Sequence, residues 1–120
     1  MKIVLNDGTV RECENKEEEL HVLRHSAAHI MAQAVKDLSG CDIAIGTTAG
    51  IGRGGISVIT DEYEIMATTD IYADLCENDS EKLFQRCENG IEKTLEILLL
   101  LLNNDFNRMK SLENIEIIKY

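Results

Sequence analysis

The fold of this chain is decided by the stretch Asp42-Ile43-Ala44-Ile45-Gly46-Thr47-Thr48-Ala49-Gly50-Ile51-Gly52-Arg53-Gly54-Gly55-Ile56-Ser57-Val58-Ile59. Two short apolar, β-branched runs predict strands at Asp42–Gly46 and Ile56–Thr60. The connection between them is too short for a parallel crossover, so we expect a local antiparallel meander. The segment Gly46–Gly55 carries five glycines, two threonines and one arginine, and the rest of the chain supplies a scaffold around it.

This glycine loop predicts a small-ligand site. Glycine lets a ligand approach the main chain, and successive amides in such a loop can form an anion-binding nest that Arg53 would assist. The loop lacks the Gly-Lys-Ser/Thr ending of a Walker loop, and because a strand follows it, it is not a Rossmann fingerprint. The alternative is a long hairpin connection whose glycines only satisfy turn geometry. The residues predicted to bind the ligand are Gly46, Thr47, Thr48, Gly50, Gly52, Arg53, Gly54, Gly55, Thr69 and Asp70.

The flanking segments predict an α/β fold, with a small mixed, partly antiparallel sheet packed by two long helices in one domain over residues 1–120. Local signals predict a hairpin at Lys2–Cys13 around Asp7-Gly8, helices at Glu17–Leu38 and Glu81–Asn104, a third strand at Tyr63–Ile71 and an edge strand at 113–120. Gly40 ends the first helix and Asn78-Asp79-Ser80 offers caps for the second. Helical spacing predicts one core stripe of Leu20, Leu23, Ala27, Met31, Ala34 and Leu38, and another of Leu83, Cys87, Ile91, Leu95 and Leu98.

Composition narrows the function classes. The formal net charge is -10 and aromatic residues make up 4%, which disfavours a general nucleic-acid binder. The longest apolar run, Ile97–Leu102, falls far short of the ~20 residues that cross a bilayer, so we expect no membrane partner. The four cysteines show no paired spacing, which favours free thiols in a soluble cytoplasmic protein. The leucines near residue 100 are either buried or part of an oligomer interface.

Three smaller groups of residues are further candidates. His21, His25 and His29 are spaced like ligands on one helix face, opposite the leucine stripe, and they are either part of a metal site or a solvated face. Asp70, with Asp74, either binds a ribose hydroxyl or a metal, or ends a strand. Cys13 is a nucleophile candidate without an assigned base, or an inert thiol.

From about Ile30 to Ile97 the chain resembles the HcgF-type proteins of iron-guanylylpyridinol (FeGP) cofactor assembly in methanogens. The same region is more distantly similar to the CinA carboxy-terminal domain, whose members include nicotinamide mononucleotide deamidases. The resemblance implies a three-layered homodimer whose loop binds a nucleotide-like or guanylylpyridinol-like molecule, with no further cofactor. The HcgF family's thioester-forming cysteine has its nearest match in Glu12-Cys13. The matching blocks are Met31–Lys36, Gly46–Gly55, Thr69–Leu75 and Asn89–Lys93.

A second resemblance covers Met1–Val10 and Arg24–Lys36, which look like the amino-terminal and editing region of bacterial threonyl-tRNA synthetase. It implies a metal or tRNA-associated fragment centred on His25 and His29. No histidine follows His29, so the editing site is incomplete. A third hypothesis is a ligand-free structural dimer, and whether the chain is an enzyme stays open.

Overall fold

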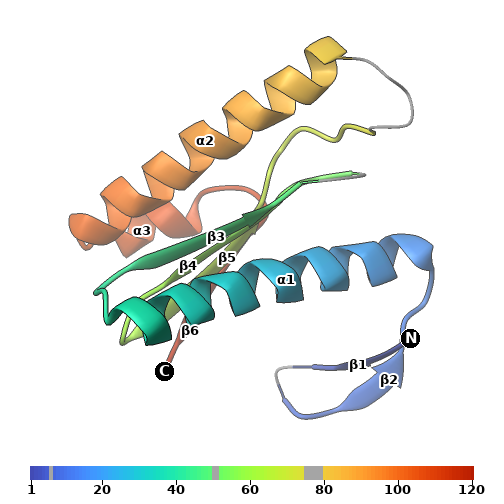
Figure 1. Cartoon of the computed structure of the whole chain (residues 1–120), viewed down its shortest axis with the longest axis horizontal. Helices are drawn as coiled ribbons and strands as arrows, with labels where there is room; N and C mark the ends of the chain where they lie inside the picture. Colours follow the sequence, from blue (N-terminus) through green and yellow to red (C-terminus); the bar gives the residue numbers. More distant parts are fainter. Residues whose placement is uncertain (6, 50–51, 75–79) are drawn as a thin grey trace.

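The computed structural model describes residues 1–5, 7–49, 52–74 and 80–120. Figure 1 shows three layers, with one sheet lying between α1 on one face and α2 with α3 on the other. This arrangement confirms the predicted α/β fold with two long helices on a small sheet. The elements are β1 (Lys2–Val4), β2 (Val10–Glu12), α1 (Lys16–Ser39), β3 (Ala44–Thr48), β4 (Gly55–Ile59), β5 (Tyr63–Thr68), α2 (Ser80–Leu102), α3 (Phe106–Lys110) and β6 (Ile115–Lys119).

The main sheet is a meander in the order β3-β4-β5-β6, and every neighbouring pair is antiparallel. The predicted local meander and the edge strand β6 are therefore confirmed. The described strands include no parallel pair of the kind that a mixed sheet would contain. Register places Gly46 opposite Ser57, and Met66 opposite Glu116. Ile56 and Val58 face α2 and α3, where the larger core lies, and Ile59 faces α1.

Helix α1 has nearly the predicted bounds, but it packs by a different face. Asn15 caps its start by accepting a hydrogen bond from the Glu18 amide (2.8 Å), and Gly40 ends it at φ 68°. The fully buried residues are Ala28 and Ala32. The predicted core stripe is wrong, because its members Leu23, Met31 and Leu38 are 53%, 42% and 90% exposed and Ala27 and Ala34 are exposed as well.

Small side chains explain this orientation of α1. A Cβ atom placed on Gly46 would lie 2.2 Å from the Ala28 carbonyl oxygen and 2.9 Å from the Ala32 amide nitrogen. The helix backbone therefore sits directly on β3, which only a face of alanines against a glycine permits. Larger apolar side chains on that face would hold the helix away from the sheet.

Helix α2 also turns a different face inward. The predicted stripe is wrong for Cys87, Ile91 and Leu95, which are exposed, whereas Arg86, Lys93, Ile97, Leu100 and Leu101 are buried. Near the end of the helix, Leu100 and Leu101 are buried in the core, whereas Leu99 and Leu102 are exposed. The caps predicted at Asn78 and Asp79 lie outside the described residues. Helix α3, whose Met109 is fully buried, was not predicted.

The first hairpin forms a separate two-stranded sheet beside the start of α1 (Figure 1). The Leu5 amide donates to the Thr9 carbonyl (2.8 Å), so the connection is longer than the predicted two-residue turn, and one of its residues lies outside the described set. Among the described helices, none combines the length and apolar character needed to cross a membrane.

Candidate functional site

A cavity with both polar and apolar walls opens beside α1 on the sheet face that this helix covers only in part. Helix α1 lies against β3 and β4, and the cavity extends from it toward β5 and β6. The volume of this cavity, called the α1 groove below, is about 640 Å³, within the range typical of small-molecule sites. Its walls are formed by Asn15, Glu17, Glu18, His21, Arg24, His25, Arg53, Met66, Ala67, Thr68, Tyr72, Asn114, Ile115 and Glu116.

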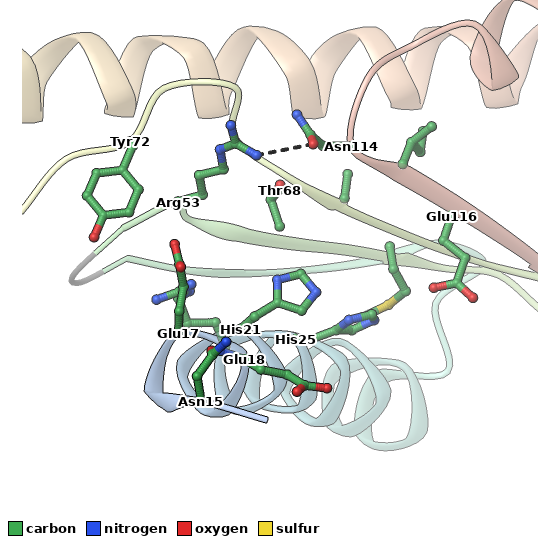
Figure 2. A pocket seen from close by; sticks show the side chains of 14 residues that line it. Asn15, Glu17, Glu18, His21, His25, Arg53, Thr68, Tyr72, Asn114 and Glu116 are labelled. Atoms are coloured by element: carbon green, nitrogen blue, oxygen red, sulfur yellow. Dashed lines mark hydrogen bonds between the residues drawn. The ribbon is translucent and has the colours of Figure 1, made fainter. Parts of the chain in front are cut away.

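The first turns of α1 supply one wall. His21 and His25 are four residues apart, so both side chains rise from the same helix face toward the strands (Figure 2). Their rings meet edge to face, with centroids 5.7 Å apart. Burial, with a smaller contribution from His21, lowers the pKa of His25. The prediction that this face points to solvent is therefore wrong for His25, which is half-buried in the groove.

Arg24 and Tyr72 flank the glycine loop at Gly52. This glycine has φ 92°, and a Cβ atom on it would lie 3.2 Å from both Arg24 Nη1 and Tyr72 Cε2. A side chain there would thus be strained and would crowd both groups. Burial lowers the pKa of Arg24, while the charges of Tyr72 and Glu17 act in the opposite direction. The loop glycine therefore creates space for a guanidinium and a phenol ring at the groove.

Arg53 approaches from the opposite wall and is held by a chain of polar groups. Its Nη1 donates to Asn114 Oδ1 (3.2 Å), as Figure 2 shows, and Asn114 Nδ2 donates to Asp70 Oδ1 (3.2 Å). Asp70 is paired with buried Lys93 (2.7 Å). Burial alone would raise the pKa of Asp70, but hydrogen bonds from Lys93 and Asn114 outweigh it and lower the pKa. Asp70, predicted to bind ligand directly, lies behind Arg53 in this chain.

Three described glycines of the predicted amide cradle have their amides bonded within the protein, and anion binding by the cradle stays a prediction. The Gly52 amide donates to the Ala73 carbonyl (2.7 Å), the Gly54 amide to Thr69 Oγ1 (2.9 Å) and the Gly55 amide to Thr48 Oγ1 (3.1 Å). These donors are occupied within the protein, so an anion there would have to displace them. Gly46 packs on α1, and Gly50 lies outside the described residues.

A second cavity, of about 440 Å³, lies on the other side of the sheet, between α2 and the ends of β3 and β4. Of the predicted ligand-binding residues that the structure describes, five line this α2 cavity and only Arg53 lines the α1 groove. A role of these residues in ligand binding stays a prediction. The cavity is lined by Thr47, Thr48, Ala49, Gly54, Gly55, Ile56, Thr69, Arg86, Cys87, Gly90, Ile91, Thr94 and Leu95.

The remaining sequence candidates lie apart from one another. His29 Nδ1 lies 2.5 Å from Glu64 Oε1, and Tyr120 donates to the other oxygen of Glu64 (3.1 Å). Within the described ranges, no three histidine, cysteine or acidic side chains are grouped to hold a metal ion. Cys13 follows β2 and lines neither cavity, and burial raises the pKa of its thiol.

Arg24, Tyr72 and Asn114 are groove residues that sequence reasoning missed. A signal for Arg24 was present, because Glu17, His21, Arg24 and His25 form a polar face at helical spacing. Asn114 carried no comparable signal, since only the pairing of β5 with β6 brings it to Arg53.

Comparisons with known proteins identify the family. The family model for the FeGP cofactor biosynthesis protein HcgF matches residues 16–102. A UPF0254 protein of Methanococcus aeolicus is 44% identical over 79 residues, covering 66% of this chain and 46% of the relative. Its counterpart in Methanococcus vannielii is 38% identical over 93 residues, covering 78% and 52%. This chain spans about half the length of these curated relatives. The family match includes α1, the glycine loop and α2, and the chain belongs to the HcgF family.

Proposed function

We propose that this chain binds a small anionic molecule, nucleotide-like or guanylylpyridinol-like, in the α1 groove, as its part in FeGP cofactor biosynthesis. The observation that carries the proposal is that Arg24 and Arg53 both line one cavity of about 640 Å³. Membership of the HcgF family supports the ligand class. The chain spans only about half of its relatives, so the activity of the whole protein is itself part of the proposal.

The guanidinium groups of Arg24 and Arg53 favour an anion beside them, although the groove wall also carries Glu17, Glu18 and Glu116. The chain carries a formal net charge of -10, yet two guanidinium groups line the same groove. Burial disfavours the charged form of Arg24, as its lowered pKa indicates, and a bound phosphate would compensate through charge-assisted hydrogen bonds. Arg53 is exposed at the groove and anchored by Asn114, so it can reach a ligand without first being ordered.

The rest of the groove suits a heterocycle. The rings of His21, His25 and Tyr72 offer faces for stacking, and carboxylates such as Glu17 accept hydrogen bonds from ring and amino N–H groups of a guanine-like base. A phosphate near Arg24 and Arg53 and a base among the other residues would use both parts of the groove.

Calorimetry with guanosine monophosphate, guanosine and inorganic phosphate tests this proposal. We expect the nucleotide to bind more tightly than either fragment, and a hundredfold excess over its Kd to stabilise the fold by about 2.7 kcal/mol. Arg53→Gln should weaken nucleotide binding at least tenfold, whereas Arg108→Gln on α3, away from both cavities, should leave it unchanged. No heat and no stabilisation with any of the three ligands, or equal effects of the two variants, would contradict the proposal.

Cys13 is proposed as the residue that attaches a guanylylpyridinol ligand covalently, on the strength of the family resemblance at Glu12-Cys13. In this step Cys13 Sγ bonds to the carboxyl carbon of the ligand's carboxymethyl group, the C–O bond of that carboxyl breaks, and one water molecule leaves. In sequence Cys13 lies two residues before Asn15, which belongs to the groove wall, although Cys13 itself lines neither cavity. Its raised pKa means that the thiol needs a base or a bound ligand to become reactive. Intact-mass measurement after incubation with the ligand tests the attachment, with Cys13→Ser as the control, and an unmodified wild-type mass removes Cys13 as the nucleophile.

A further inference from the structure

The outward face of α2 carries an apolar stripe that the described part of the chain leaves exposed. Its large members, Phe84, Ile91, Leu95, Leu99 and Leu102, are between 59% and 65% exposed. Their spacing of seven, four, four and three residues places them in one row along the helix. Single exposed apolar residues are ordinary on protein surfaces, but a continuous row of this length is typical of an interaction site.

The α2 cavity opens within this stripe, because Cys87, Ile91 and Leu95 belong to the cavity wall and to the outward face of the helix. The cavity is therefore a pocket in the floor of the stripe. Its volume of about 440 Å³ exceeds what one leucine or phenylalanine side chain requires, so a large apolar group can enter it.

Polar groups around the cavity are already engaged within the protein. Thr94 Oγ1 donates to the Gly90 carbonyl (2.7 Å), and Arg86 donates to the Gly52 and Ala73 carbonyls (2.9 and 3.1 Å). Thr69 Oγ1 accepts from the Gly54 amide and donates to the Ile71 carbonyl (2.9 Å). Most of the surface that lines the cavity is apolar, and these polar groups already have partners within the protein, so the cavity favours an uncharged, apolar guest.

A row of acidic side chains follows one edge of the apolar stripe. Glu81, Glu88, Glu92 and Glu96 are all exposed and repeat at seven, four and four residues, which places them in a row beside the apolar one. A second copy packed antiparallel about a two-fold axis would bring this acidic row against its own equivalent. Repulsion between the two rows disfavours such a dimer, whereas lysine or arginine side chains along a partner would be attracted.

We infer that the outward face of α2 docks an amphipathic helical segment that inserts one large apolar side chain into the α2 cavity and lays a row of basic residues along Glu81, Glu88, Glu92 and Glu96. This surface lies on the opposite side of the sheet from the α1 groove, so the inference does not depend on the proposed ligand. It gives the chain a protein-binding function beside ligand binding, in the helix-in-groove mode.

Two labelled peptides of about 18 residues, roughly five helical turns, test the inference by fluorescence anisotropy. Both carry leucine and phenylalanine in an apolar row, and they differ only in having lysine or glutamate along the flank. We expect the lysine peptide to bind at least tenfold more tightly at low salt, with the difference shrinking as salt rises. The double change Glu88→Gln with Glu92→Gln should reduce that salt dependence.

Variants of the chain distinguish peptide binding that uses the α2 cavity from non-specific hydrophobic binding. Cys87→Trp fills the cavity from an exposed position and should weaken binding of the lysine peptide at least tenfold, whereas Leu38→Ser on α1 should not change it. Circular dichroism and urea unfolding establish that each variant is folded. Equal binding of both peptides, or unchanged binding by Cys87→Trp, would overturn the inference. So would a dimer of the chain that Ile91→Lys converts to monomers, because a second copy would then be the occupant.

Discussion

Substituting Gly46 by alanine tests the close contact that positions α1. The added Cβ atom would lie 2.2 Å from the Ala28 carbonyl oxygen, and ordinary contact begins near 3.4 Å, so the shortfall is 3.4 − 2.2 = 1.2 Å. Both partners are backbone atoms of α1, which no rotamer change can move. The whole helix must therefore shift outward, or β3 must bend.

The cost of this shift sets the expected magnitude. Overpacking a core by one methyl group typically costs about 1–3 kcal/mol, and because rigid backbone opposes this one we expect about 3 kcal/mol. For a domain of this length the entropy of unfolding converts each kcal/mol into about 4 °C, so Tm should fall by about 12 °C. Urea unfolding followed by circular dichroism measures the free energy directly.

Gly40→Ala provides the matched control. Gly40 also has an unfavourable backbone for alanine, at φ 68°, but a Cβ atom added to it would meet no other atom within 4 Å. That variant should lose only about 1 kcal/mol from backbone strain. If Gly46→Ala unfolds with the same free energy as Gly40→Ala, or loses less than about 1 kcal/mol, the close approach of α1 to β3 is refuted.

Three other substitutions test the exposure of Leu38, the burial of Lys93 and the pH dependence of stability through His25. Leu38→Ser should change the free energy of unfolding by no more than about 0.5 kcal/mol, because Leu38 is 90% exposed; a loss of about 2 kcal/mol would place it in the core. Lys93→Met should cost about 3 kcal/mol in urea unfolding, since it leaves Asp70 and the Thr68 and Glu113 carbonyls without their buried donor; a neutral result would show that water replaces it. His25 has a lowered pKa in the folded state, so the unfolded chain takes up a proton first and stability falls as pH drops below about 6.5. His25→Gln should flatten this part of the pH–stability curve, and an unchanged curve would contradict the burial of His25.

The sequence predicted the elements well because their signals are local. Gly40 ends α1 in the left-handed region, and the glycine loop separates two antiparallel strands that differ from their predicted bounds by two residues or fewer. Each of these features depends on a few neighbouring residues. Helix α3 was missed because its five residues are too few for a helical pattern and its helix depends on packing of Met109.

The faces of α1 and α2 that pack against the sheet could not be predicted from the spacing of apolar residues along the helices. In α1 the most apolar row is the exposed one, because the sheet demands small side chains opposite Gly46. In α2 two buried cations, Arg86 and Lys93, satisfy carbonyls at the ends of strands and loops, which no count of leucines reveals. Tertiary contacts decided both orientations and left these apolar rows exposed in the described part of the chain.

The face of α1 that packs on Gly46 is the same face that builds the groove. Arg24 and His25 precede Ala28 by four and three residues, so the side that rests on β3 at the alanines carries polar groups one turn earlier. The helix backbone touches the sheet at Ala28 and Ala32, and again at Arg24, whose carbonyl accepts a hydrogen bond from Thr48 Oγ1 (3.4 Å). From this contact the side chains of Arg24 and His25 extend to the wall of the cavity. The depth of the groove thus depends on the contact at Gly46. A variant that forces α1 outward there should weaken nucleotide binding even though no groove residue has changed, which links the packing of the fold to the proposed site.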